Sequence, residues 1–357
     1  MASREGEAAR PRRVAFPPRY EFPEFVPHPL FRSGHSQTIA GAYVPHRRLV
    51  YRAQVHALEL PDGDRTALHD DCPESWRDGH PCVLLLHGLG GSHLSPYMVR
   101  VSEKLRERGI RCFRLDLRGH GLGWDWAQQP GHAGRSEDAR GAIARILELC
   151  PWSDLAAVGV SMGGNILLKL LGEWGDAAPT RLSRAMAVAP PVDLERCSRN
   201  MLKRDNRIYA RAFLRSLQRQ LRIRRGVMKS LANLRLERPP RTLWEFDDVV
   251  TAPLSGFAGV QDYYRQCSAA RVTDRIAVPT TVLAAADDPL IPFNMFEKTV
   301  FSPAVRIHVT GHGGHVGYLG IANRDPDRRW LDWRILEWLQ APLEEPQPTV
   351  DPLPGGE

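Results

Sequence analysis

One stretch constrains the fold more than any other: an apolar run, a Gly-x-Ser-x-Gly turn and a helical pattern follow one another over residues 156–168. This order predicts a buried strand that passes through a tight turn directly into a helix. Gly159 and Gly163 lack the Cβ atoms that would collide where strand and helix approach each other. Ser161 stands at the apex, where a strained turn can expose a hydroxyl for nucleophilic attack. An ordinary glycine-rich turn between a strand and a helix would have the same sequence. Other residues must therefore decide between a nucleophilic serine and such a turn.

Further predicted strands alternate with helical patterns on both sides of this turn. Strands are expected at 82–86, 111–117, 182–188, 280–286 and 305–309, and helices at 95–108, 136–149 and 327–339. Strands that are buried on both faces and alternate with helices favour a mostly parallel, doubly wound α/β sheet. Before it, a strand at 49–60 and a second near 66–69 predict a β-hairpin. Ser136 is expected to cap its helix, and the last helix should bury Trp330, Trp333, Ile335 and Trp338.

The alternation of strands and helices stops at 191–269. From Lys203 to Arg225 the basic residues fall largely three or four positions apart, and Phe213, Leu214 and Leu217 form another face. This spacing predicts a cationic amphipathic helix. The basic face of this helix is either exposed to solvent while the apolar face packs on the core, or it rests on an anionic lipid surface.

These patterns predict one α/β domain that is interrupted by a helical insertion. The core is expected at 21–190 and 270–341, a helical lid at 191–269, and disordered tails at 1–20 and 342–357.

Composition restricts the compartment and the partners. The chain has 357 residues and a net charge of +7, which by itself would allow nucleic acid or anionic lipid as a partner. No nucleic-acid-binding motif is present and many of the arginines gather in one predicted helix, so we expect no nucleic-acid partner. The six cysteines form no Cys-x-x-Cys pair, which indicates reduced thiols in a cytoplasmic protein. Neither a signal peptide nor a membrane span is predicted.

Two backbone N–H groups are candidates for an oxyanion hole. Leu89 lies in the glycine-rich loop 87–91 that follows the strand at 82–86, and Met162 opens the helix after Ser161. Such groups can point at the position where negative charge develops during acyl transfer. His87 is expected to be a structural hydrogen-bonding residue, and the loop 118–121 to frame the site without chemistry of its own.

A serine, an acid and a histidine occur in the order that a triad on this type of sheet requires. Ser161 comes first, Asp288 follows one late strand, and His315 follows the last. The histidine would take the serine proton, and the carboxylate would fix the histidine tautomer. Asp288 is preferred because it lies four residues before a proline, but Asp287 stays open as the acid.

A metal site is not expected among the late histidines. His308, His312 and His315 are close in sequence, but a Gly pair breaks any helix there and no carboxylate pattern accompanies them.

With these residues in place, the chain resembles the α/β-hydrolase superfamily and, within it, the YheT-like branch, also called the AB hydrolase-4 family. The matching segments are SGHSQTI at 33–39, HGLGG at 87–91, GRSEDA at 134–139, GVSMGGN at 159–165, TAPLSGF at 251–257, DYY at 262–264, ADDPLIP at 286–292 and GGHVGYLG at 313–320. The resemblance implies a cofactor-free Ser-Asp-His hydrolase that acts on a small ester or an acyl lipid. Acyl transfer to an alcohol is an alternative with the same triad, and a binding module without catalysis is another. The double aspartate and the arginine-rich lid depart from the family pattern. The first leaves the acid open and the second leaves the choice of substrate open.

Overall fold

The computed structural model describes residues 20–44, 51–232, 234–321 and 325–343. The predicted tails at 1–20 and 342–357 therefore lie almost wholly outside the described residues. Within the described part, eight strands form one sheet in the order β1-β2-β4-β3-β5-β6-β7-β8. They are β1 (Gln54–Glu59), β2 (Arg65–Asp71), β3 (Cys82–Leu86), β4 (Arg111–Leu115), β5 (Leu155–Val160), β6 (Leu182–Val188), β7 (Thr280–Ala285) and β8 (Val305–Thr310). β1 and β2 form an antiparallel hairpin, β2 pairs antiparallel with β4, and the remaining pairs are parallel. The predicted hairpin and parallel sheet are confirmed.

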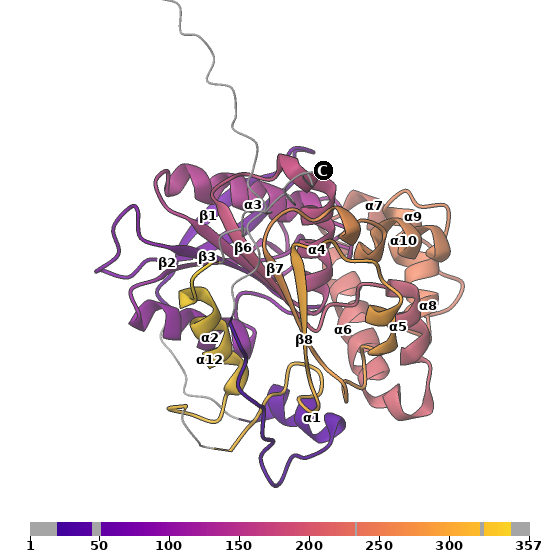
Figure 1. The fold of residues 1–357 in the computed structure, drawn as a ribbon. Coiled ribbons are helices and arrows are strands. Elements are labelled where there is room, and N and C mark those ends of the chain that lie inside the picture. The colour runs from indigo at the N-terminus through magenta and orange to yellow at the C-terminus, as the bar shows by residue number, and fades with distance from the viewer. Residues whose placement is uncertain (1–19, 45–50, 233, 322–324, 344–357) are drawn as a thin grey trace, which may run out of the picture.

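Helices cover both faces of this sheet (Figure 1). α2 (Pro96–Glu107) packs beside α12 (Trp330–Gln340), and α3 (Ser136–Leu149) packs beside α4 (Met162–Trp174). The strands between them are buried along their whole length in β3, β5 and β7, as continuous apolar runs require. The short helix α1 (Gly34–Tyr43) precedes the sheet in the chain and begins at a Ser33 capping box.

Two local predictions are corrected by tertiary contacts. Ser136 is not the cap of α3 but its first residue, and its hydroxyl donates to Glu173 of α4 at 2.5 Å. Trp333 is only half-buried, since Lys104 lies over its ring and its indole N–H donates to the carboxylate of Asp327. The first strand begins at Gln54, and the predicted start at 49 falls on residues outside the described ones.

A group of helices is inserted between β6 and β7 and gathers at one side of the sheet (Figure 1). It comprises α5 (Leu194–Met201), α6 (Arg207–Arg224), α7 (Lys229–Ala232), α8 (Leu243–Phe246), a π-helix (Asp247–Thr251), α9 (Ala252–Leu254) and α10 (Val260–Cys267). A last short helix, α11 (Asn294–Glu297), follows β7.

The predicted amphipathic helix is α6, and it begins later than expected. A 3₁₀ turn occupies Arg204–Asn206 because the amide of Asn206 bonds the carbonyls of Asn200 and Pro289. Along α6, Leu214 is buried while Arg211 is exposed, so the helix turns its apolar face inward. Within the described residues, no helix is both long enough and apolar enough to cross a membrane.

Candidate active site

Ser161 lies at the strained turn between β5 and α4. Its φ of 53° and ψ of −121° are unusual for a residue with a side chain. The turn is tight because a Cβ on Gly159 would lie 2.4 Å from the carbonyl oxygen of Gly163. A Cβ on Gly163 would lie 2.6 Å from the carbonyl oxygens of Leu86 and His87. Only glycine fits at either position, as the sequence indicated.

The structure brings Ser161, His315 and Asp288 into one hydrogen-bonded chain. His315 Nε2 lies 2.9 Å from Ser161 Oγ, and His315 Nδ1 lies 2.8 Å from Asp288 Oδ2. The other carboxylate oxygen of Asp288 accepts from the backbone N–H groups of Leu290 at 2.8 Å and Ile291 at 3.0 Å. These bonds fix the orientation of the carboxylate. The arrangement suits a serine whose proton passes to a histidine that is held in one tautomer.

Asp287 faces a different set of partners. Its carboxylate accepts from the backbone N–H of Gly314 at 2.9 Å and lies 3.3 Å from His312 Nδ1. Of the two aspartates that the sequence left open, only Asp288 bonds His315.

The two candidate oxyanion donors belong to segments that adjoin Ser161. Met162 is the first residue of α4, so its N–H has no carbonyl one turn earlier to bond. Leu89 follows Gly88, where a Cβ would lie 3.1 Å from Ser161 Cβ, and the loop therefore runs against the serine. The hydroxyl of Tyr97 accepts from the N–H of Gly88 at 2.8 Å and holds this loop in place.

Two residues near this loop behave as the sequence suggested. His87 Nδ1 donates to the carbonyl of Gly88, and His87 Nε2 accepts from the N–H of Leu117 at 3.0 Å. Burial lowers the pKa of His87 to about 3, so the ring is neutral. His120, in the loop 118–121, lines the cavity beside Ser161.

Helix α1 supports the histidine, a role that its sequence did not indicate. Thr38 Oγ1 accepts from the backbone N–H of His315 at 2.8 Å, and the Gln37 side chain bonds both the N–H and the carbonyl of Leu319. The only sequence signal for this contact was the SGHSQTI segment.

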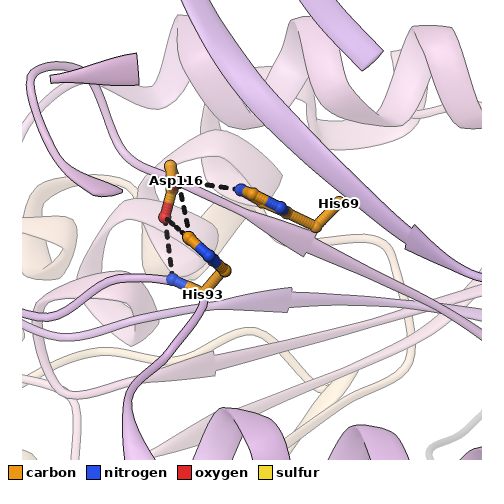
Figure 2. A group of neighbouring side chains, drawn as sticks. All are labelled: His69, His93 and Asp116. Atoms are coloured by element: carbon orange, nitrogen blue, oxygen red, sulfur yellow. Dashed lines mark hydrogen bonds and ion pairs between the residues drawn. The ribbon is translucent and has the colours of Figure 1, made fainter. Parts of the chain in front are cut away.

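A second polar cluster, formed by His69, His93 and Asp116, was also missed (Figure 2). Asp116 accepts from His69 Nε2 at 2.9 Å, from His93 Nδ1 at 2.9 Å, from the His93 N–H at 2.7 Å and from the Leu122 N–H at 2.8 Å. Burial alone would raise the pKa of Asp116, but the hydrogen bonds from His69 and His93 outweigh it and hold the pKa well below its usual range. The cluster anchors His93, which lies in the same loop as Leu89.

The three ligand-type atoms of this cluster lie within 4.8 Å of one another, so it must be weighed as a metal site. The rings of His69 and His93 stack with centroids 3.6 Å apart and planes inclined by 16°. A metal ion binds an imidazole nitrogen in the plane of the ring, and two nearly parallel stacked planes do not meet close to both nitrogens. The geometry therefore fits a hydrogen-bonded cluster better than a metal site. The late histidines are dispersed, since His308 stacks on Phe22 and His312 lies beside Asp287.

Two cavities meet at Ser161, Leu89 and His315. The inner cavity, of about 170 Å³, runs beneath the inserted helices. The outer cavity, of about 340 Å³, runs between α1, the loop that carries Leu89, and α6. Phe213 and Leu290 line both cavities. The arrangement offers separate space for the two arms of an ester whose carbonyl lies at Ser161.

Comparison with known proteins agrees with this architecture. Residues 81–320 match the family model described as alpha/beta hydrolase fold. YheT of Escherichia coli, a protein named as an esterase, is 35% identical over 326 residues, which cover 90% of this chain and 94% of YheT. Phospholipase ABHD3 of Mus musculus is 27% identical over 292 residues, which cover 81% of this chain and 69% of that protein. The esterase Pf2001 of Pyrococcus furiosus shares the fold with a TM-score of 0.52 at 15% identity, over 89% of this chain and 95% of its own. The chain therefore belongs to the α/β-hydrolase family.

Proposed function

We propose that this hydrolase cleaves carboxylic esters through an acyl-enzyme on Ser161. The Ser161 oxygen attacks the ester carbonyl carbon while His315 takes its proton, and Asp288 stabilises the imidazolium that forms. The N–H groups of Leu89 and Met162 stabilise the oxyanion. His315 then gives the proton to the departing alcohol, and a water molecule, activated in the same way, releases the acid.

The observation that carries this proposal is the unbroken chain of hydrogen bonds from Ser161 Oγ through His315 to Asp288 Oδ2. A fluorophosphonate probe tests it, because this reagent forms a covalent bond only with an activated serine. We expect one label on Ser161 in the folded wild-type protein and none in Ser161→Ala. Ser183, which lies on the same sheet, provides the matched control, and Ser183→Ala should label like wild type. A folded wild-type protein without label on Ser161 would contradict the proposal.

Transfer of the acyl group to an alcohol uses the same triad and is the alternative. An alcohol in place of water would attack the same acyl-enzyme, so the ratio of new ester to free acid in the presence of glycerol or ethanol separates the two activities. A role in binding alone predicts that Ser161→Ala keeps the biological activity of the protein, whereas catalysis predicts its loss.

We further propose that residues 191–269 act as a lid over a small ester or an acyl lipid, and that the enzyme is cytoplasmic. Helices of this segment line the inner cavity, which supports the first part. The six cysteines are free thiols, as expected in a reducing compartment, which supports the second.

The exposed side of α6 supports peripheral contact with anionic membranes. Arg211, Arg215 and Arg219 are exposed, and none of them forms an ion pair with another described residue. Each basic side chain near an anionic bilayer contributes on the order of 1 kcal/mol, and salt weakens the effect. The apolar face of α6 is turned inward, so we expect electrostatic adsorption without deep insertion.

Co-sedimentation with vesicles tests this contact. Binding to anionic vesicles at low salt should exceed binding to neutral vesicles, and it should fall when Arg211, Arg215 and Arg219 are changed to glutamine. A matched control changes Arg108, Arg271 and Arg275, which precede the N-terminal ends of β4 and β7 at the opposite edge of the sheet. Equal binding by both triple variants and wild type would refute the role of α6.

A further inference from the structure

The inserted segment contacts the acid loop, residues 286–292, through two asparagine side chains. β6 and β7 are parallel neighbours in the sheet, so the insertion leaves the carboxyl end of β6 beside the loop that follows β7. Asn200 belongs to α5, and Asn206 directly precedes α6. Both side chains are buried, at 7% and 4% exposed. Buried amides need hydrogen-bond partners, and most of the partners of these two lie on the acid loop.

Each of these amides donates to two backbone carbonyls. Asn200 Nδ2 lies 2.8 Å from the carbonyl oxygen of Pro289 and 3.1 Å from that of Leu290. Asn206 Nδ2 lies 2.8 Å from the carbonyl oxygen of Pro289 and 3.0 Å from that of Asn200. A carbonyl can only accept and an NH₂ group has two N–H bonds, so both donors of each amide are used. The two side chains therefore fix the carbonyls of residues 289 and 290.

These carbonyls belong to the two peptide groups that hold Asp288. One peptide group joins the Pro289 carbonyl to the N–H of Leu290, and the next joins the Leu290 carbonyl to the N–H of Ile291. Both N–H groups donate to Asp288 Oδ1, at 2.8 and 3.0 Å. A peptide group is planar, so a bond that fixes its carbonyl also fixes the direction of its N–H. Hydrogen bonds that are linked in this way also strengthen one another.

We propose that Asn200 and Asn206 are positioning residues for the triad acid. They act through the two peptide groups on Asp288 Oδ1, which keeps Oδ2 directed at His315 Nδ1. Neither asparagine lines the two cavities at Ser161, so neither contacts a substrate that is bound there. The inference rests on the proposed esterase function and adds a role for the inserted segment, whose base holds the triad acid in place.

Asn206→Ala is the first test because it removes one of these contacts and leaves the other groups paired. The Pro289 carbonyl keeps the bond from Asn200, and the Asn200 carbonyl keeps the backbone N–H of Lys203 at 3.1 Å. The Asn206 side chain forms no cap bond with α6, so the helix end is spared. We expect kcat for a p-nitrophenyl ester to fall about tenfold with KM within about threefold of wild type, because a bond to the acid loop is lost and no substrate contact changes. Asn200→Ala removes two bonds to the loop and should lower kcat at least as much.

A double-mutant cycle separates positioning from a general structural role. In the Asp288→Asn background, Asn206→Ala should lower kcat by less than about twofold, because the residue acts through a carboxylate that is already lost. A general loosening of the active site would instead lower kcat by the same factor in both backgrounds. The rate at which a fluorophosphonate labels Ser161 gives the same comparison where turnover is slow.

Gln218→Ala is the matched control. Gln218 lies on α6, and its amide donates to the carbonyl of Pro240 at 2.9 Å, which belongs to the insertion itself. This variant should keep kcat within about twofold of wild type.

The failure of this inference differs from the failure of the esterase proposal. Circular dichroism confirms that each variant is folded. If Asn206→Ala and Asn200→Ala keep the kcat of wild type, the inference is wrong and the esterase proposal stands. An equal loss with and without the Asp288 carboxylate also overturns it. If wild type hydrolyses no ester and Ser161 is not labelled, the esterase proposal itself fails.

Discussion

Replacement of Asp288 by asparagine tests the proposed triad at a position where the chain supplies its own control. The backbone N–H groups of Leu290 and Ile291 hold Asp288 Oδ1, so the oxygen of an asparagine would stay there. Its NH₂ group would then face His315 Nδ1, which would have to accept a hydrogen bond. The proton of His315 would move to Nε2, the atom that must receive the proton of Ser161.

The wrong tautomer abolishes general-base catalysis but leaves the oxyanion hole and substrate binding intact. In a serine protease, the corresponding loss is about 10⁴ in kcat, or roughly 5.5 kcal/mol of transition-state stabilisation. We expect a loss of the same order here, with KM changed by less than about threefold because Asp288 does not contact the substrate.

Asp287→Asn is the matched control. Its oxygen can still accept from the N–H of Gly314, and its amide can donate to His312 Nδ1. We expect kcat within about tenfold of wild type. Steady-state hydrolysis of a p-nitrophenyl ester, with circular dichroism to confirm folding, gives both values. If Asp287→Asn lost more activity than Asp288→Asn, the assignment of the acid would be refuted.

Three further predictions concern stability and the loop that carries Leu89. The folded-state pKa of His87 is about 3, below the ordinary value of 6.5, so the unfolded chain binds the proton more readily. The free energy of unfolding should therefore fall as the pH drops from about 6.5 to 3, by at most roughly 5 kcal/mol from this residue, and His87→Gln should flatten that slope in urea titrations. Asp116→Asn turns an NH₂ group toward the donors of His69 and His93. This change should lower the free energy of unfolding by about 2–4 kcal/mol. It should also lower kcat/KM, because the cluster anchors the loop that carries Leu89. A stable variant with unchanged kcat/KM would show that the cluster does not position Leu89. Gly163→Ala should cost at least about 2 kcal/mol because its Cβ meets two carbonyl oxygens, whereas Gly226→Ala, with nothing near its Cβ, should be close to neutral, as thermal unfolding would show.

The centre of the sheet was predictable because β3, β5 and β7 are apolar or nearly apolar runs that are buried along their whole length and end at loops. A strand that is buried on both faces needs apolar side chains on both, so its local sequence pattern agrees with its position in the fold. Once the strands were predicted, Ser161 and His315 could be placed at the carboxyl ends of two of them, where the loops of a parallel sheet meet. Boundaries were less predictable, since the start of α6 depends on a bond from Asn206 to the carbonyl of Pro289, 83 residues away.

The His69–His93–Asp116 cluster could not be predicted from the sequence alone. His69 and Asp116 are 47 residues apart, and they meet because β2 pairs antiparallel with β4. No periodicity or short motif in the sequence indicates that β2 pairs with β4. The bonds from Asn200 and Asn206 to the acid loop were missed for the same reason, since both residues belong to the insertion while Pro289 follows β7.

The choice between Asp287 and Asp288, in contrast, depends on a local signal that the sequence does contain. In Asp-Asp-Pro-Leu-Ile, the proline after Asp288 has no N–H, so the first donors available to that carboxylate are those of Leu290 and Ile291. An aspartate whose side chain accepts from the residues two and three positions later forms an Asx turn, which fixes its carboxylate against its own backbone. Asp287 is followed by Asp288 and then by the same proline, so the residue two positions ahead offers it no donor. Its carboxylate instead bonds the loop that precedes His315, through Gly314. The position of a proline therefore separates two adjacent acids: one is locked beside the histidine, and the other braces the loop that carries it.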